Sequence, residues 1–129
     1  MLPFSIEFTH GDPAGPQLEA AIQRAILSRQ LPAASHVPSW RVVATELRVH
    51  PETVRDAFAA LRKAGWLVGD DEQPVAALPS ASAVEAVRTQ LIRKRVQSLL
   101  ADARLLGISI ERISEMLKEE RENERRVSD

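Results

Sequence analysis

Two hydroxyl side chains and two arginines lie near the starts of two short amphipathic segments. Ser39 and Arg41 begin the first segment, and Thr53 and Arg55 lie in the first turns of the second. A guanidinium is a planar fork that matches the O6 and N7 acceptors of guanine. A hydroxyl group can donate a hydrogen bond to a phosphate, and a threonine can also contact a thymine methyl. In the second segment, Thr53 and Arg55 therefore have the chemistry to contact double-stranded DNA.

The two segments carry the end signals of helices. Ser39 is suited to cap a helix over residues 39–47, because its hydroxyl can accept from a free amide of the first turn. Pro51 suits the first position of a second helix over residues 51–63, and Gly65 suits its end. Two short helices joined by a brief link predict a helix-turn-helix, whose second helix enters the major groove.

The second helix divides into an apolar and a polar face. Its apolar face carries Val54, Ala57, Phe58 and Leu61 at helical spacing. The polar face holds the candidate reading side chains. An alternative for the two arginines is a surface ion pair, for instance with Glu46 or Asp56.

The flanking segments complete a small domain. Residues 17–29 have apolar positions at helical spacing, and residues 3–8 are compatible with a short extended segment. After the helix pair, "WLVG" and "PVAAL" can form a two-stranded hairpin. Its turn holds three acids and no Lys or Arg: Asp70, Asp71 and Glu72. Because acidic side chains repel phosphates, we expect this hairpin to be short or to point away from a bound duplex.

Residues 80–129 predict two further helices. Ser82 and Glu85 form the pattern of a capping box, and Gly107 suits the end of the helix that they open. A second helix begins at Ser109, and its polar tail over residues 118–129 is expected to fray into solvent. Apolar positions follow one side of both helices, and we predict that they pair two subunits: Val84, Val87, Leu91, Val96, Leu99, Ala103, Leu106, Ile110, Ile113 and Leu117.

Composition restricts the classes of function. Apolar residues make up 44% and charged residues 27% of the 129 residues, which fits a soluble globular chain. No apolar run approaches the roughly 18 residues of a membrane span and no signal-peptide pattern opens the chain, so we expect a cytoplasmic protein without membrane contact. With no cysteine, three histidines and scattered acids, we expect no metal site, no cofactor and no catalytic site.

The net charge sets a condition on any nucleic-acid binding. The formal net charge is −1, and residues 1–79 hold seven Lys or Arg against nine Asp or Glu. These counts do not predict a broadly basic surface that would attract DNA. DNA affinity would have to come from a few well-placed arginines.

The stretch "VPSWRVVATELRVHPETVRDAFAALRKAGWL", residues 37–67, follows a known pattern. That pattern is "LPS-x-R-x-LA", then "GV-x-x-x-TV-x-x-A", ending in "L-x-x-x-G". Its matching positions here are Pro38, Ser39, Arg41, Ala44, Leu47, Val49, Thr53, Val54, Ala57, Leu61 and Gly65. The stretch resembles the winged-helix domain of the GntR family of bacterial transcription regulators. The short helical region after it is similar to that of the YtrA-like subfamily.

The resemblance implies a mainly α fold, with a winged helix-turn-helix domain over residues 1–79 and a helical dimerisation region over residues 80–129. It implies a homodimeric transcription regulator that binds an inverted-repeat operator, and we expect a repressor. The candidate DNA contacts are Ser39, Arg41, Arg48, His50, Thr53 and Arg55. Arg48 replaces the glycine usual in the link, where it either adds a phosphate contact or strains the turn. His50 is also suited to a cap.

Two further departures from the family pattern flank the helix pair, and the second of them keeps another function open. "AAS" at residues 33–35 replaces the usual "PGD", and the acidic turn replaces a basic, glycine-rich wing. The acidic wing favours an alternative in which the domain has lost DNA binding and acts as a protein-interaction adaptor. A small-molecule effector is left undefined, because the region after residue 79 is too short for a sizeable ligand-binding domain.

Overall fold

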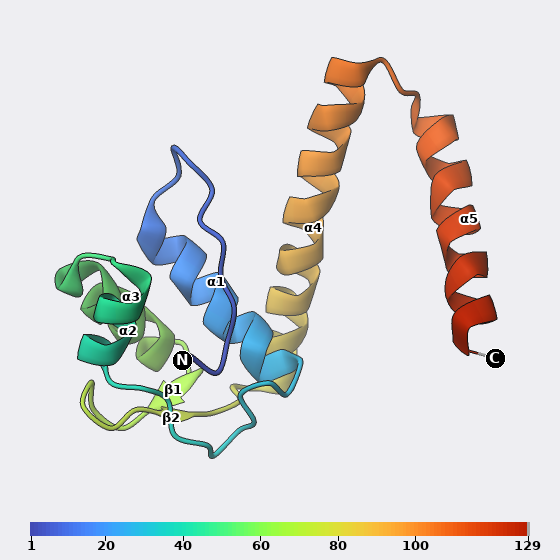
Figure 1. Ribbon diagram of the computed structural model, residues 1–129. Helices are drawn as coiled ribbons and strands as arrows, with labels where there is room; N and C mark the ends of the chain where they lie inside the picture. The colour runs from blue at the N-terminus through green and yellow to red at the C-terminus, as the bar shows by residue number, and fades with distance from the viewer. Residues whose placement is uncertain (129) are drawn as a thin grey trace. The chain divides into compact units, whose positions relative to one another are not determined.

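The computed structural model describes residues 1–128 of the chain, and these form five helices and one two-stranded sheet (Figure 1). The mainly α fold predicted from the sequence is confirmed. By their contacts the residues divide into two compact units, Met1–Arg88 and Thr89–Asp129.

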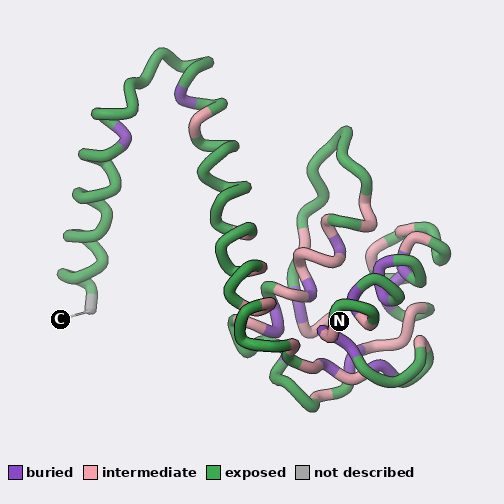
Figure 2. Tube along the Cα trace, turned by 180° about the vertical axis from the view of Figure 1, so that it is seen from behind, coloured by how far each residue is buried: buried purple, intermediate pink, exposed green. Residues whose placement is uncertain are grey.

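Three helices of the first unit surround its core: α1 (Ala14–Leu27), α2 (Trp40–Leu47) and α3 (Pro51–Lys63). α3 packs against both α1 and α2, so it is the central helix of the unit. Figure 2 shows the buried residues gathered on the inward sides of these helices. The largest fully buried side chains include Leu18, Ile22, Val43, Val54, Phe58, Leu61 and Trp66. Burial of this apolar surface is the main favourable contribution to the folding of the unit.

The helix ends follow the expected signals. The Ser39 hydroxyl accepts a hydrogen bond from the Val42 amide at 3.5 Å, as predicted for an N-cap. Pro51 is the first residue of α3. Gly65 follows the end of α3 with a φ of +89°, a left-handed conformation that glycine adopts without strain.

The hairpin is as short as we expected. β1 (Leu67–Val68) pairs antiparallel with β2 (Val75–Ala76), and Leu67 lies opposite Ala76. Residues 34–37 run along the other side of β2, where the Ala34 amide donates to the Ala76 carbonyl at 2.7 Å. The extended segment expected for residues 3–8 forms no strand, and residues 34–37 occupy the free edge of β2.

The helix α4 (Ala81–Leu106) starts earlier than the predicted capping box requires. Ser80 occupies the cap, since its hydroxyl accepts from the Ala83 amide at 3.3 Å. Ser82 lies inside the first turn, and the Glu85 carboxylate pairs with Arg88 at 3.8 Å. The Ser82–Glu85 capping box is therefore wrong, because the serine two residues upstream caps the helix.

The first two turns of α4 belong to the first unit. Val84 and Val87 are half-buried and pack against its core. α4 starts where we placed the boundary between the two regions, after residue 79, but the contacts assign residues 80–88 to the first unit. Two of the predicted dimerisation residues thus pack within the chain.

The second unit consists of the rest of α4, a short turn and α5 (Ile110–Ser128). Gly107 ends α4 with a φ of +69°, and the Ser109 hydroxyl caps α5 by accepting from the Arg112 amide at 3.1 Å. The expected fraying of residues 118–129 is wrong for residues 118–128, which continue the helix. Glu, Lys and Arg favour helices, and Arg112 pairs with both Glu115 and Glu119 at 3.1 Å. These hydrogen bonds raise the pKa of Arg112, the Glu119 bond contributing most.

Candidate nucleic-acid interface

The fold brings the candidate residues of α2 and α3 onto one surface. The Arg41 guanidinium lies 4.9 Å from the centre of the Trp40 ring, and the Arg55 guanidinium lies 5.0 Å from the same centre. The indole is thus a common platform for an arginine of each helix, with cation–π attraction to both. We call Ser39, Trp40, Arg41, Thr53 and Arg55 the reading surface.

Trp40 was not among the predicted contact residues. The sequence did hold a signal for Trp40, because it lies between the predicted contact residues Ser39 and Arg41. A side chain between two contact residues at the start of a helix lies near both. The structure leaves Trp40 half-buried, whereas Trp66 lies fully in the core.

The arginines of the reading surface are accessible to a ligand. The side chain of Arg41 is 68% exposed and that of Arg55 is 48% exposed. Thr53 is half-buried, because its methyl group lies close to Gly15 at the start of α1. Ser39 is also half-buried and serves as the N-cap of α2. Arg41 and Arg55 therefore offer most of the contact area.

The link between the two helices carries the other two candidates. Arg48 has φ +55° and ψ 44°, in the left-handed region, and its amide donates to the Ala44 carbonyl to end α2. This is the strained turn foreseen as one outcome for a side chain at the family's glycine position. His50 caps α3, because its Nδ1 accepts from the Glu52 amide at 3.2 Å. In neutral imidazole the proton then resides on Nε2, which leaves one donor for a ligand.

The hairpin turn has a defined conformation of its own. We call Asp70, Asp71 and Glu72 the acidic tip. The Asp70 carboxylate accepts from the amides of Glu72 at 3.0 Å and Gln73 at 2.9 Å, which closes the turn. Gly69 precedes it with a φ of +82°, and a Cβ at this position would lie 2.8 Å from the Gln73 carbonyl oxygen. Only glycine fits this turn without rearrangement.

The acidic tip lies against the reading surface. Glu72 accepts from the Trp40 indole N–H at 3.1 Å and pairs with Arg41 at 3.5 Å. The Asp71 carboxylate pairs with Arg62 at 2.6 Å and lies 3.7 Å from Arg55. The Trp40 backbone amide donates to the Asp71 carbonyl at 3.2 Å. The hairpin is short, but its tip lies against Arg41 and Arg55, two of the residues predicted to bind DNA.

These contacts decide which ion pairs the arginines form. Arg41 pairs with Glu72, not with Glu46, and Glu46 pairs with the chain's terminal amino group at 2.8 Å. Arg55 pairs with Asp71 and, along α3, with Glu52 at 3.7 Å. Among the described residues, the two partners suggested from the sequence, Glu46 and Asp56, therefore pair with neither arginine. The first amide of α2 is also occupied by the tip.

The predicted dimerisation positions of the second unit form an incompletely covered apolar stripe. Ala103 and Ile113 are buried near the turn between α4 and α5, and Leu91 is half-buried. Large apolar side chains remain exposed on both helices. Five of them were predicted: Val96, Leu99, Leu106, Ile110 and Leu117. Four others were not: Ile92, Leu105, Met116 and Val127. The two helices diverge from their turn, so neither covers the other along its length (Figure 1).

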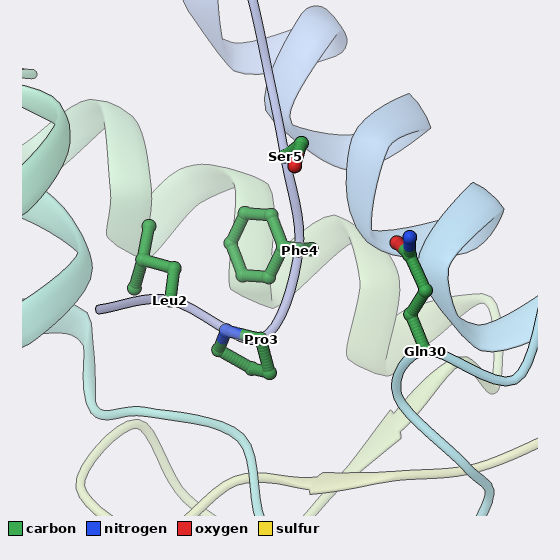
Figure 3. A pocket seen from close by; sticks show the side chains of 5 residues that line it. All are labelled: Leu2, Pro3, Phe4, Ser5 and Gln30. Atoms are coloured by element: carbon green, nitrogen blue, oxygen red, sulfur yellow. The ribbon is translucent and has the colours of Figure 1, made fainter.

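Other surfaces of the described chain offer little chemistry. A depression near the N-terminus is lined by Leu2, Pro3, Phe4, Ser5 and Gln30 (Figure 3). It has two neutral polar side chains and no ionisable one. Among the described residues no group of His, Asp and Glu is arranged to hold a metal ion, and no helix is long and apolar enough to cross a membrane.

Comparisons with solved structures identify the fold. A GntR family transcriptional regulator from Listeria monocytogenes matches 87% of this chain and 98% of its own, with 22% identity and a TM-score of 0.62. A transcriptional antiterminator from Listeria monocytogenes EGD-e matches 90% and 87%, with 22% identity and a TM-score of 0.58. YtrA from Sulfolobus acidocaldarius, a GntR-family transcription factor, matches 75% and 96%, with 23% identity and a TM-score of 0.53.

These matches bear on the fold of nearly the whole chain, including its two C-terminal helices. The chain has the winged helix-turn-helix fold with a helical extension that is also found in these regulators. No family model and no curated protein matches the sequence. The structural likeness thus confirms the fold that the sequence resemblance implied.

Proposed function

We propose that the protein is a homodimeric, sequence-specific DNA-binding transcription regulator. The observation that carries this proposal is the reading surface, in which Arg41 and Arg55 from two helices share the Trp40 ring. In a helix-turn-helix the first turns of the second helix meet base edges, and here those turns present Arg55 with an exposed guanidinium. The fold shared with known regulators supports the same function.

The side chains have separate roles in this proposal. Arg55 reads guanine through its two terminal nitrogens, while Arg41 and Ser39 contact phosphate at the start of α2. Arg48 adds a phosphate contact from the link, and His50 and Thr53 contact the duplex beside it. A regulator that represses its target by occupying an inverted-repeat operator needs no further chemistry from the chain. We assign the protein to the intracellular compartment in which its DNA lies.

The second unit supplies the dimer contact in this proposal. Exposed or buried apolar side chains on α4 recur at steps of four and three residues: Ile92, Val96, Leu99, Ala103 and Leu106. This is the spacing of a helix seam that packs against a partner helix. A two-fold dimer would place the recognition helices on half-sites about one helical turn of DNA apart, or a multiple of that.

Binding by an Arg55→Ala variant tests the proposal. With DNA recovered from a random pool by the wild-type protein, we expect Arg55→Ala to weaken binding about 5- to 150-fold, the cost of one bidentate guanine contact. Arg88→Ala is the matched control, because Arg88 is an exposed arginine with a similar pair along its own helix, to Glu85 at 3.8 Å. Equal binding by Arg55→Ala and wild type in a gel-shift titration, with the dimer intact, would refute the assigned role.

The contacts of the acidic tip favour one alternative, a protein-interaction adaptor without DNA affinity. In that case Arg41 and Arg55 are structural partners of Glu72 and Asp71. The salt dependence of binding separates the two functions. A regulator that contacts phosphates loses affinity steeply as salt rises, whereas an adaptor is not retained on DNA even at low salt.

A further inference from the structure

The acidic tip occupies the groups that the proposed function reserves for DNA. A carboxylate lies beside each reading arginine, Glu72 beside Arg41 and Asp71 beside Arg55. The tip also takes the indole N–H of Trp40 and its backbone amide, both at the start of α2. A phosphate group would bind through the same kinds of contact, that is, guanidinium pairs and amide donors at a helix start.

We propose that the acidic tip is an intramolecular competitor of DNA, and that DNA binds the reading surface by displacing Glu72 and then the Asp71 contact with Arg55. This inference rests on the proposed function, because it concerns the same surface. It adds a regulatory device: the closed tip lowers affinity for all DNA, so that only a site with good base contacts displaces it.

The charges of the acidic tip offset those of the three arginines beside it. Asp70, Asp71 and Glu72 bring three negative charges to a surface where Arg41, Arg55 and Arg62 bring three positive ones. Long-range attraction to a polyanion is therefore cancelled while the tip is closed. Non-specific DNA binding depends on such attraction, so the closed tip lowers it more than it lowers binding to a site with good base contacts.

The contacts differ in strength along the tip, which allows it to open without unfolding. Asp71 holds Arg62 at 2.6 Å, and both side chains are largely covered, so this pair anchors the hairpin to α3. Glu72 is 53% exposed and lies 3.5 Å from Arg41, a solvent-screened pair that is weak. Glu72 is therefore the end that opens first.

Neutral tip variants test the competition. At about 50 mM salt, we expect Glu72→Gln to bind DNA about two- to fivefold more tightly and Asp71→Asn with Glu72→Gln about tenfold more tightly than wild type. Arg41 and Arg55 then displace counterions from the DNA phosphates without first giving up a carboxylate partner. The plot of log affinity against log salt should steepen by about 1 for the single variant and about 2 for the double variant. The tenfold gain should nearly vanish by about 150 mM.

Asp56→Asn is the matched control for through-space repulsion. Asp56 is an exposed acid next to Arg55 on α3, and it is not one of the ion-pair partners of the reading arginines. Competition predicts that its removal changes affinity and salt slope much less than Glu72→Gln. Equal gains from the two variants would overturn the proposal in favour of simple repulsion.

A measurement without DNA separates this inference from the proposed function. Trp66 is buried, so quenching of tryptophan fluorescence by acrylamide reports on Trp40. Loss of the Glu72 contact in Glu72→Ala should increase the quenching constant of Trp40, and unchanged quenching would show that the tip does not close. If quenching rises in Glu72→Ala but neither wild type nor Glu72→Gln binds DNA, the tip closes in the wild type and the proposed function fails. If wild type binds DNA and Glu72→Gln binds no more tightly, the function stands and the competition is refuted.

Discussion

Replacing Arg48 by glycine should stabilise the protein and weaken its binding to DNA. Arg48 has a left-handed backbone, with φ +55° and ψ 44°, at the end of α2. A side chain in this region places its Cβ close to the following carbonyl, and glycine has no Cβ. The turn itself is retained, because the amide of residue 48 still donates to the Ala44 carbonyl in the variant.

The expected gain in stability follows from two opposing terms. Removing the left-handed penalty contributes about 1–2 kcal/mol. The greater freedom of glycine in the unfolded chain takes back about 0.5–1 kcal/mol. Arg48 is exposed and forms none of the ion pairs of the described residues, so no ion pair is lost. The two terms leave a net gain of about 0–1.5 kcal/mol, and the centre of this range, about 0.75 kcal/mol, raises Tm by about 3 °C.

Arg48→Ala is the control that separates strain from charge. It loses the same guanidinium but keeps a Cβ in the left-handed region, so its Tm should stay near that of wild type. Both variants lose the proposed phosphate contact, and both should lower the salt slope of DNA binding by about 1. Circular dichroism melting and fluorescence anisotropy titrations measure the two effects. If Arg48→Gly melts no higher than Arg48→Ala, the strain argument is refuted.

Two further predictions concern the dimer seam and the hairpin turn. Leu99→Glu should convert the proposed dimer to a monomer in analytical ultracentrifugation, because it puts a charge on the apolar stripe of α4. The control Ser98→Glu, on the adjacent face, should leave the dimer intact, and dimers in both variants would exclude this seam. Gly69→Ala should reduce the free energy of unfolding, measured in urea, by about 1–3 kcal/mol, because the new Cβ would lie 2.8 Å from the Gln73 carbonyl oxygen. An unchanged urea midpoint would mean that the turn adapts to the side chain.

Local signals predicted the helix pair well. Ser39, Pro51 and Gly65 mark the ends of α2 and α3, and each acts through hydrogen bonds or backbone angles within a few residues of itself. The capping box failed for a local reason as well. Ser80 and Ser82 both fit a cap, and the half-burial of Val84 and Val87 against the core accompanies the earlier start.

The environment of the reading surface could not be predicted in the same way. The pairs of Glu72 with Arg41 and of Asp71 with Arg55 join residues far apart in the sequence, and they depend on where the hairpin turn bends. The charge of the tip is visible in the sequence, and charge alone suggested that it avoids the duplex. The position of the tip follows from the Asp70 turn, the Arg62 anchor and the Trp40 amide, which only the folded chain brings together.

The most direct test of the central claim is selection of bound sequences from a random pool of duplex DNA by the full chain. The proposed regulator predicts enrichment of an inverted repeat, with half-sites separated by about one or two helical turns and guanine at the positions that Arg55 reads. A pool that stays random after repeated rounds at low salt would contradict DNA recognition by this protein and would favour the adaptor.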